Sequence, residues 1–250
     1  MIKIIVLGIL QGLTEFLPIS SSGHLAILEK LWAIKESAAL TVALHFGTLL
    51  STLIYFIKPI GEIIKGVVKM KSDSLRYLLY ILLGNIPAGL FALVFKERIE
   101  ESFNDLKLVF IFLGLTGVIL LLTRIIKLGN KEVGMKEAFI VGIAQMFSVF
   151  PGFSRSGLTI SAGLFSNLSP TSAFQFSFLL SLPAILGANI LELRKITSFD
   201  EPIFLIFGVI LSFIFGILSL KLLRKMVQKN FYIFGFYCLL ISIIFLIGSV

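Results

Sequence analysis

The chain is poor in charged residues for its length. Asp, Glu, Lys and Arg make up only 14% of its 250 residues, whereas soluble domains carry about 25%. The mean hydropathy of +1.03 and the hydrophobic content of 57% therefore predict an integral membrane protein. The sequence also lacks a polar stretch long enough for a soluble domain or a disordered tail, so we expect a single transmembrane domain over residues 1–250.

Cysteine is almost absent, and basic residues never form an arm or a long run. The single Cys238 lies in an apolar run, which excludes a disulfide framework and any metal or iron–sulfur site built from cysteines. The formal charge is +8, but the Lys and Arg residues stand in short segments between apolar runs. This distribution argues against nucleic-acid binding and indicates membrane topology signals instead.

Six apolar segments have the roughly 20 residues that a helix needs to cross a bilayer. They are residues 37–57, 75–95, 106–126, 171–191, 203–222 and 231–250. Two further apolar regions are interrupted, namely 4–17 followed by 25–34, and 138–150 followed by 158–168. Each piece is too short to span, and Pro, Gly and Ser fill the interruptions. Such broken helices are tolerated in a membrane only inside protein or beside a wet cavity, so we expect two re-entrant helix hairpins.

The two interrupted regions resemble each other in sequence. Residues 8–25 (GILQGLTEFLPISSSGHL) align without gaps on residues 142–159 (GIAQMFSVFPGFSRSGLT), with seven identities in eighteen positions. Each repeat, about 1–130 and about 135–250, then holds one hairpin and three spanning helices. An odd number of crossings inverts the second repeat. The predicted fold is all-α: a polytopic membrane protein with six spanning helices and two re-entrant hairpins in an inverted-topology repeat.

Charge counting predicts the orientation. Under this topology the segments 58–76, 124–137 and 221–229 share one side of the membrane and hold 13 Lys and Arg against four acids. The other side holds 8 Lys and Arg against nine acids, with Glu15 and Arg155 left out as intramembrane residues. The positive-inside rule makes the first side cytoplasmic. Both termini then face outside, the two hairpin turns meet near the midplane, and a cavity between them opens outward.

Glu15 and Arg155 are charged residues close to the turns of the two predicted hairpins. A charge at mid-bilayer costs at least about 2.5 kcal/mol, so each of them calls for a partner or a task. Gln11 precedes Glu15 by four residues and shares its helix face. Glu15 suits a metal ion, a proton or Arg155 as its partner. In the simplest structural interpretation, Glu15 and Arg155 form a buried pair that locks the hairpins together.

Both interruptions end in a polar cluster. The clusters are Ser20, Ser21, Ser22, Gly23 and His24 in the first, and Ser154, Arg155, Ser156, Gly157 and Thr159 in the second. A serine that precedes a helix is usually an N-cap. Free N–H groups at two helix starts, together with the guanidinium of Arg155, also form a site for a phosphate or a carboxylate.

Histidine occurs only twice in the chain, at His24 and His45. His24, among hydroxyls and near a carboxylate, can act as general base, general acid or nucleophile. His45 lies in the middle of a predicted span, where a hydrogen bond between helices is the simpler interpretation. Asn189 and Asn85, with the nearby prolines, are interpreted as marks of helix kinks.

Two motifs together resemble the signature regions of the undecaprenyl-diphosphate phosphatase family, the bacitracin-resistance family. The first is Gln11-x-x-x-Glu15 followed by PISSSGH over 18–24, and the second is PGFSRSGLT over 151–159. Length, number of spans and both motifs agree, so the resemblance covers the whole chain. It implies an enzyme that hydrolyses undecaprenyl diphosphate to undecaprenyl phosphate and inorganic phosphate. Such an enzyme recycles the lipid carrier for cell-wall synthesis, confers bacitracin resistance and depends on a divalent cation, Mg²⁺ or Ca²⁺.

The resemblance also implies roles for individual residues. The implied catalytic residues are Glu15, Ser21, His24 and Arg155, with Glu15 also the metal ligand. The implied substrate-binding residues are Gln11, Ser22, Ser154, Ser156 and Thr159. The family accepts Glu or Gln at its opening position, and Gln11 leaves this chain one carboxylate fewer for the cation. The implied location is the plasma membrane of a bacterial cell, where the enzyme works alone or as a homodimer.

The nucleophile and the function class stay open at this level. Either Ser21 activated by His24, or a water deprotonated by Glu15 or His24, attacks the β-phosphorus. An inverted repeat with broken helices is equally a design for a secondary transporter or a flippase of a lipid phosphate or small anion. The two repeats of such a protein should carry similar chemistry, yet Glu15 and His24 align with Val149 and Leu158. This asymmetry favours catalysis. A purely structural subunit would leave both intramembrane charges unexplained.

Overall fold

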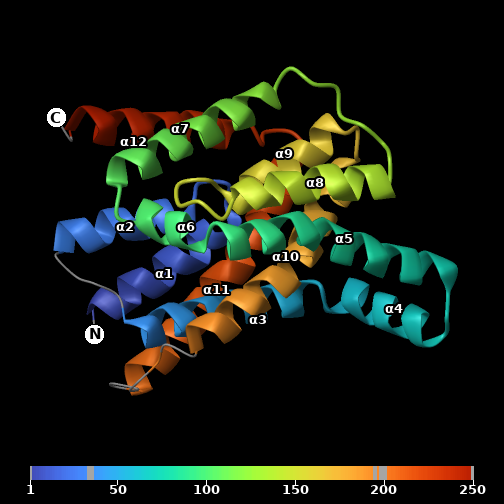
Figure 1. The fold of residues 1–250 in the computed structure, drawn as a ribbon, viewed down its shortest axis with the longest axis horizontal. Helices are drawn as coiled ribbons and strands as arrows, with labels where there is room; N and C mark the ends of the chain where they lie inside the picture. Colours follow the sequence, from blue (N-terminus) through green and yellow to red (C-terminus); the bar gives the residue numbers. More distant parts are fainter. Residues whose placement is uncertain (1, 33–36, 194–195, 197–201, 249–250) are drawn as a thin grey trace.

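The structure is a computed structural model that describes residues 2–32, 37–193, 196 and 202–248, and the described residues form twelve α-helices (Figure 1). In chain order they are α1 (Ile2–Phe16), α2 (Ser21–Trp32), α3 (Ala38–Tyr55), α4 (Ile57–Val68), α5 (Ser72–Val94), α6 (Lys96–Ser102), α7 (Leu106–Leu122), α8 (Met135–Phe147), α9 (Arg155–Phe165), α10 (Pro170–Leu193), α11 (Pro202–Val227) and α12 (Ile233–Gly248). The all-α polytopic fold that the sequence predicts is confirmed. The ends of two predicted segments, 33–34 and 249–250, lie outside the described residues.

Three of the described helices, α5, α10 and α11, are long and apolar enough to cross a membrane on their own. Two more spans are obtained if α3 is joined to α4 and α6 to α7, although these pairs bend by 70° and 95°. The last helix, α12, is apolar but shorter, with 16 residues. The described helices therefore supply a multi-pass membrane protein, and the division into six spans and two hairpins remains a prediction.

The segment 58–76 is not the loop that the sequence predicts. Residues Ile57–Val68 form α4, which runs back along α5 to the turn at 69–71 (Figure 1). The segment resembles a loop because it contains the charged residues Lys58, Glu62 and Lys65. Its apolar residues nevertheless recur at helical spacing. Gly66 packs against Ser74, which brings α4 close to α5. The charges thus lie on a helical hairpin rather than on a flexible loop.

The helices of the two sequence repeats are interleaved. The most extensive packing joins α1 with α11, α3 with α11, α7 with α12, and α5 with α8. Each of these pairs takes one helix from either half of the chain. Glycine makes the close crossings: a Cβ on Gly12 would lie 2.7 Å from the carbonyl oxygen of Ser212, and a Cβ on Gly142 would meet the carbonyl of Gly84. The small residues that the sequence offers at these crossings therefore set the distances between the helices.

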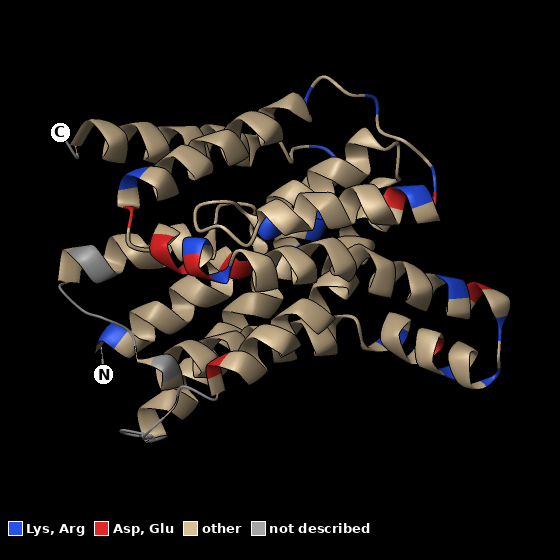
Figure 2. Cartoon of the chain, in the orientation of Figure 1, with Lys and Arg blue, Asp and Glu red and all other residues tan. Residues whose placement is uncertain are grey.

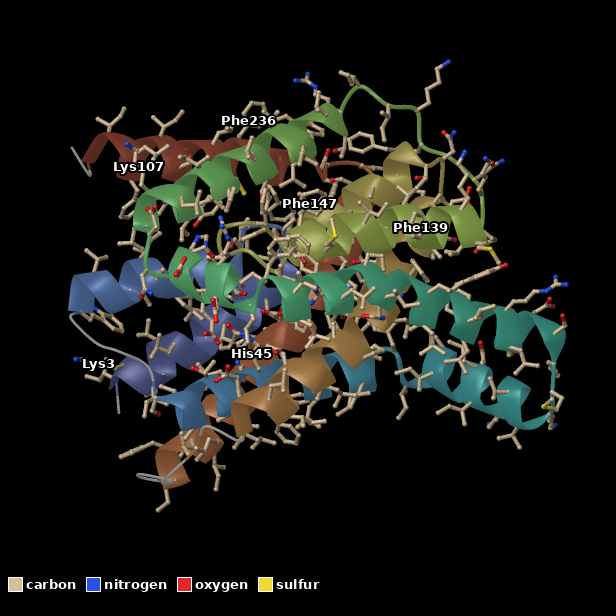
Figure 3. The ribbon with its side chains drawn as sticks, viewed as in Figure 1. Lys3, His45, Lys107, Phe139, Phe147 and Phe236 are labelled. Atoms are coloured by element: carbon tan, nitrogen blue, oxygen red, sulfur yellow. The ribbon has the colours of Figure 1, made fainter. Side chains whose placement is uncertain are left out.

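Both termini lie at the same end of the long axis (Figure 1). Lys3 and Lys107 are found at this end (Figure 3). The turn between α4 and α5 lies at the opposite end, and Lys and Arg gather there with some acids (Figure 2). The acids of α6, which are Glu97, Glu100 and Glu101, lie in the half that carries the termini. This separation agrees with the charge asymmetry counted from the sequence.

Candidate active site

The turns at the tips of the two hairpins have matching hydrogen bonds. The backbone N–H of Gly23 donates to Ser20 Oγ at 3.2 Å, and the N–H of Gly157 donates to Ser154 Oγ at 3.2 Å. Each capping serine also contacts the serine two residues later, Ser22 at 3.2 Å and Ser156 at 3.3 Å. Because corresponding residues lie 134 positions apart, the repeated sequence makes a repeated structure, and both capping interpretations hold.

The two turns are tied to each other and to α7. The N–H of Gly152 donates to Ser22 Oγ at 3.3 Å, which links the second turn directly to the first. The N–H of Ser154 donates to Thr116 Oγ1 at 3.2 Å. Gly152 has a φ of +96°, and a Cβ there would meet the carbonyl oxygen of Val109. The glycine thus lets the second turn press against α7, and Thr116 holds it there.

Glu15 and Arg155 form an ion pair between the two hairpins. Arg155 Nη2 lies 3.2 Å from Glu15 Oε1, and the two side chains are 14% and 11% exposed. The other oxygen, Glu15 Oε2, accepts hydrogen bonds from Ser21 Oγ at 2.8 Å and from Gln11 Nε2 at 3.2 Å. The guanidinium carbon of Arg155 also lies 5.4 Å from the ring centre of Phe178. The buried pair that the sequence offered as one alternative is therefore present, and Ser21 is part of it.

A polar cavity of about 180 Å³ opens beside this pair. Its wall includes Glu15, Ser21 and Ser22 from the first hairpin, and Ser154 and Arg155 from the second. The helices α2 and α9 begin at this wall, at Ser21 and Arg155. Their N-terminal N–H groups and positive dipole ends, together with the guanidinium, favour an anion in the cavity. The geometry suits a phosphate group whose negative oxygens face the N-termini of α2 and α9.

Three of the residues predicted to bind substrate lie behind the cavity wall. Gln11, Ser156 and Thr159 each have an exposed fraction of 0%. Thr159 Oγ1 donates to the carbonyl oxygen of Arg155 at 2.7 Å and lies 2.6 Å from Ser177 Oγ, which anchors the start of α9 to α10. In this structure these side chains support the residues that line the cavity rather than lining it themselves.

His24 faces α12. Its Nδ1 lies 2.8 Å from the carbonyl oxygen of Ser20, so Nδ1–H donates and Nε2 is left as an acceptor. The hydroxyl of Tyr237 lies 2.7 Å from that Nε2, and the two ring planes differ by 7°. His24 is not among the residues that line the polar cavity. The structure thus gathers Glu15, Ser21 and Arg155 at one point, and it places the imidazole at the base of the first turn.

His45 reaches the site from the middle of α3 (Figure 3). Its Nδ1 contacts the carbonyl oxygen of Thr41 in its own helix at 2.9 Å, so the expected bond between helices is not the one that is formed. His45 instead lines a second cavity, of about 270 Å³, whose wall also includes Glu15 and Arg155. The ion pair therefore borders both cavities. The sequence could not predict this placement, because packing against α10 and α11 determines which face of α3 points to the site.

The site has few side chains that could coordinate a metal ion. Within the described residues, no group of three or more His, Cys, Asp and Glu side chains comes together. Gln11, one helical turn from Glu15, nevertheless has a buried Oε1 that meets no hydrogen-bond donor of the residues that the structure describes. Amide and carboxylate oxygens suit Mg²⁺ and Ca²⁺, which also take ligands from water and from substrate phosphates. Gln11 lines neither cavity and donates its amide N–H to Glu15, so of these two residues Glu15 alone borders the cavities, and a cation there would take its other ligands from water and a phosphate.

Comparison with known proteins gives one consistent result. The family described as "Bacitracin resistance protein BacA" matches residues 4–244. An undecaprenyl-diphosphatase of Thermosipho melanesiensis is 41% identical over 251 residues, covering 98% of this chain and 99% of that protein. An undecaprenyl-diphosphatase of Methanococcus maripaludis strain C6 is 41% identical over 95% of this chain, and one of Thermotoga sp. strain RQ2 is 38% identical over 98% of it. The similarity thus extends over nearly the whole chain and includes both hairpins.

Proposed function

Because the chain belongs to the bacitracin resistance protein BacA family, we propose that it is a membrane phosphatase that hydrolyses undecaprenyl diphosphate. The products are undecaprenyl phosphate, the lipid carrier for cell-wall synthesis, and inorganic phosphate. Resistance to bacitracin follows from this recycling. One observation supports the chemistry above others: Arg155, Ser21 and two helix N-termini converge on one polar cavity.

The positive groups of the cavity stabilise the diphosphate. As the β-phosphorus is attacked, negative charge grows on the oxygens around it and on the departing lipid phosphate. Arg155 Nη1 is buried and has no hydrogen-bond partner within the described part of the chain, so one nitrogen of the guanidinium is available to a phosphate oxygen. Donors that are already in place stabilise the transition state without a cost of reorganisation.

Ser21 is the proposed nucleophile, and Glu15 is the proposed base. The Ser21 hydroxyl donates to Glu15 Oε2 at 2.8 Å, so the carboxylate is placed to take its proton. Ser21 Oγ then bonds to the β-phosphorus as the bond from that phosphorus to the bridging oxygen breaks, and undecaprenyl phosphate leaves with the proton that Glu15 had taken, which frees the carboxylate. Water, deprotonated by Glu15, next attacks the phosphoserine. Inorganic phosphate leaves, and the proton returns to Ser21. Direct attack by a water that Glu15 activates is the alternative.

His24 is proposed as the alternative to Glu15 for deprotonating the attacking water in the hydrolytic half of this cycle. Its hydrogen bond to the carbonyl of Ser20 fixes the turn that presents Ser21. The hydrogen bond with the Tyr237 hydroxyl holds the neutral imidazole of His24 in place in the absence of substrate. A catalytic base is commonly oriented by such a third group. Hydrogen bonds of a catalytic group often rearrange when substrate binds.

A divalent cation, Mg²⁺ or Ca²⁺, is part of this proposal. The carboxylate of Glu15 would hold it together with substrate oxygens, and Gln11 would position that carboxylate through its amide N–H. Such an ion neutralises phosphate charge when bound. Ser22 and Ser154 are proposed to bind the phosphate from the cavity wall, with Gln11, Ser156 and Thr159 supporting them from behind.

The protein is proposed to act in the plasma membrane, with the polar cavity open to the outside. The charge asymmetry of the sequence and the common end of both termini support this orientation. Undecaprenyl diphosphate and membrane lipid are the expected partners, and a homodimer stays a prediction from the resemblance. A transporter is not favoured, because the matching turns carry Ser21 in one repeat and Arg155 in the other.

Phosphate release by the purified protein tests the proposal. We expect release from undecaprenyl diphosphate with Mg²⁺ or Ca²⁺, and its loss in Arg155→Ala and His24→Ala. Turnover that survives both substitutions would refute the site. If the wild-type protein releases no phosphate from any prenyl diphosphate, the phosphatase itself is refuted.

A further inference from the structure

The Glu15–Arg155 pair lies between two cavities of different character. The first, of about 180 Å³, is lined mainly by serines and by the two hairpin turns. The second, of about 270 Å³, takes apolar residues from α3 and α10, such as Val42, Ala184 and Ile185, and its wall also includes the polar residues His45 and Glu192. A ligand that reached the ion pair from the second cavity would thus pass apolar side chains as well as polar groups. Phosphate binding and hydrolysis in the first cavity do not explain why the second cavity exists.

A third cavity continues the second one. It has a volume of about 510 Å³ and lies between α3, α10 and α11, which pack against one another in the half of the molecule that carries both termini (Figure 1). Val42 and Asn189 line both the second and the third cavity, so the two share a wall. Its other lining residues are almost all apolar, among them Ala43, Phe46 and Leu193. An apolar groove therefore runs beside α3 as far as Val42 and Asn189, and the second cavity, whose wall is partly polar, continues from there to the carboxylate of Glu15.

Unpartnered polar atoms mark the inner part of this route. Asn189 Nδ2 is buried without a hydrogen-bond partner among the described residues, and so are Arg155 Nη1 and Gln145 Oε1. All three residues line the second cavity. Buried donors without partners are costly, so their presence points to a ligand that brings oxygen atoms. Two of the three atoms are donors and suit phosphate oxygens.

The combination fits an amphiphile that has an anionic head and an apolar chain. Apolar pockets of about 300–1,000 Å³ bind most of the surface of a drug-sized ligand. The second and third cavities together fall in this range. They can hold the isoprene units next to the diphosphate, while the rest of a long chain remains in the lipid. An inorganic anion would leave the apolar walls unused.

We propose that the prenyl chain of the substrate lies in the groove between α3, α10 and α11 and passes Val42 and Asn189 through the second cavity to the Glu15–Arg155 pair. The binding site for the chain is thus separate from the polar cavity that releases inorganic phosphate. This assignment rests on the proposed phosphatase function. It gives Asn189 a task beyond the helix kink that the sequence suggested, as a donor to the diphosphate at the inner end of the groove.

Obstruction of the passage tests the assignment. Val42→Trp fills the wall shared by the two cavities, and Val118→Trp places the same side chain on α7, where Val118 is 45% exposed. We expect Val42→Trp to raise the KM for undecaprenyl diphosphate about tenfold or more, because apolar contacts of the chain are lost. Val118→Trp should leave KM within about twofold of wild type. Equal KM values for the two variants would overturn the groove while wild-type turnover still upholds the phosphatase.

A labelling experiment covers the case in which Val42→Trp does not fold. A single cysteine replaces Ala43 or Val118 in a Cys238→Ala background, in vesicles of phosphatidylethanolamine and phosphatidylglycerol. Undecaprenyl phosphate should slow labelling of Ala43→Cys by a lipid-soluble maleimide about fivefold or more, and Val118→Cys should not respond. Inorganic phosphate alone should protect neither position.

The outcomes separate the two proposals. If Ala43→Cys labels at the same rate with and without undecaprenyl phosphate, a phospholipid chain or nothing fills the groove, and the inference is refuted. Protection of Ala43→Cys by inorganic phosphate alone would also refute it, since the effect would then come from the polar cavity. If wild-type protein releases no phosphate although undecaprenyl phosphate protects Ala43→Cys, the phosphatase fails and the lipid site stands.

Discussion

The hydroxyl of Ser21 donates a 2.8 Å hydrogen bond to Glu15 Oε2, across the turn that separates α1 from α2. The same carboxylate binds Arg155 from the other hairpin through Oε1. One side chain thus connects the proposed nucleophile with the proposed phosphate-binding cation. This relationship determines how substitutions at the site should behave.

Removal of the Ser21 hydroxyl should stop turnover. We expect Ser21→Ala to lower kcat about 10³-fold or more, because no other residue supplies the attacking oxygen. Phosphate release from undecaprenyl diphosphate measures this loss. Ser212→Ala is the matched control, since that hydroxyl bonds the carbonyl of Val209 in its own helix. A Ser21→Ala enzyme within tenfold of wild type would indicate direct attack by water.

Variants of the Glu15–Arg155 pair can distinguish its contribution to stability from its contribution to catalysis. Arg155→Met leaves an uncompensated buried carboxylate and should lower the free energy of unfolding by about 3 to 5 kcal/mol. The double variant Glu15→Gln, Arg155→Met should regain most of this stability and remain inactive. Thermal unfolding and phosphate release together measure the two effects, with Arg98→Met on the exposed face of α6 as control. An active double variant would show that the pair has only a structural role.

His24 and Tyr237 should differ in importance. We expect His24→Ala to lower kcat about 10²-fold or more, which is the usual loss for a proton carrier. Tyr237→Phe removes one hydrogen bond, worth about 1 kcal/mol, and should cost less than about tenfold. Steady-state kinetics of both variants decide the point. Similar small losses in the two variants would mean that His24 only positions the turn.

Gln11 should set the affinity for the cation. Gln11→Glu adds a carboxylate one turn before Glu15, so less Mg²⁺ or Ca²⁺ should be needed for half-maximal activity, while Gln11→Leu should need more. The thermal shift caused by the metal should change in the same direction, which gives a readout independent of turnover. An unchanged metal dependence in both variants would remove Gln11 from the cation site.

The orientation can be read from two single cysteines. Met70 in the turn after α4 is 75% exposed, and Phe103 near the polar cavity is 50% exposed. In intact cells an impermeant maleimide should label Phe103→Cys and not Met70→Cys. The native Cys238 is buried, so it should add little background. The reverse labelling pattern would invert the proposed topology.

Local pattern and internal repetition were enough to predict two matching turns between helices and to offer the Glu15–Arg155 pair as one alternative. Spacing along one helix was enough to place Gln11 beside Glu15. The sequence could not indicate the partner of His24, because Tyr237 is 213 positions away and belongs to a helix with no polar pattern. The sequence also could not show that α4 is helical, since Pro59, Gly61 and the lysines of that segment equally suit a loop. These features depend on packing between distant helices.

The interleaved helices have a consequence for folding. The most extensive contacts of α1, α3, α5 and α7 are all made with helices from the other half of the chain. Neither half can then make its most extensive helix packing alone, and a break near residue 130 would leave two fragments that each lack these contacts. We therefore expect the protein to melt in one cooperative transition, and separately expressed halves to become stable only when they are made together.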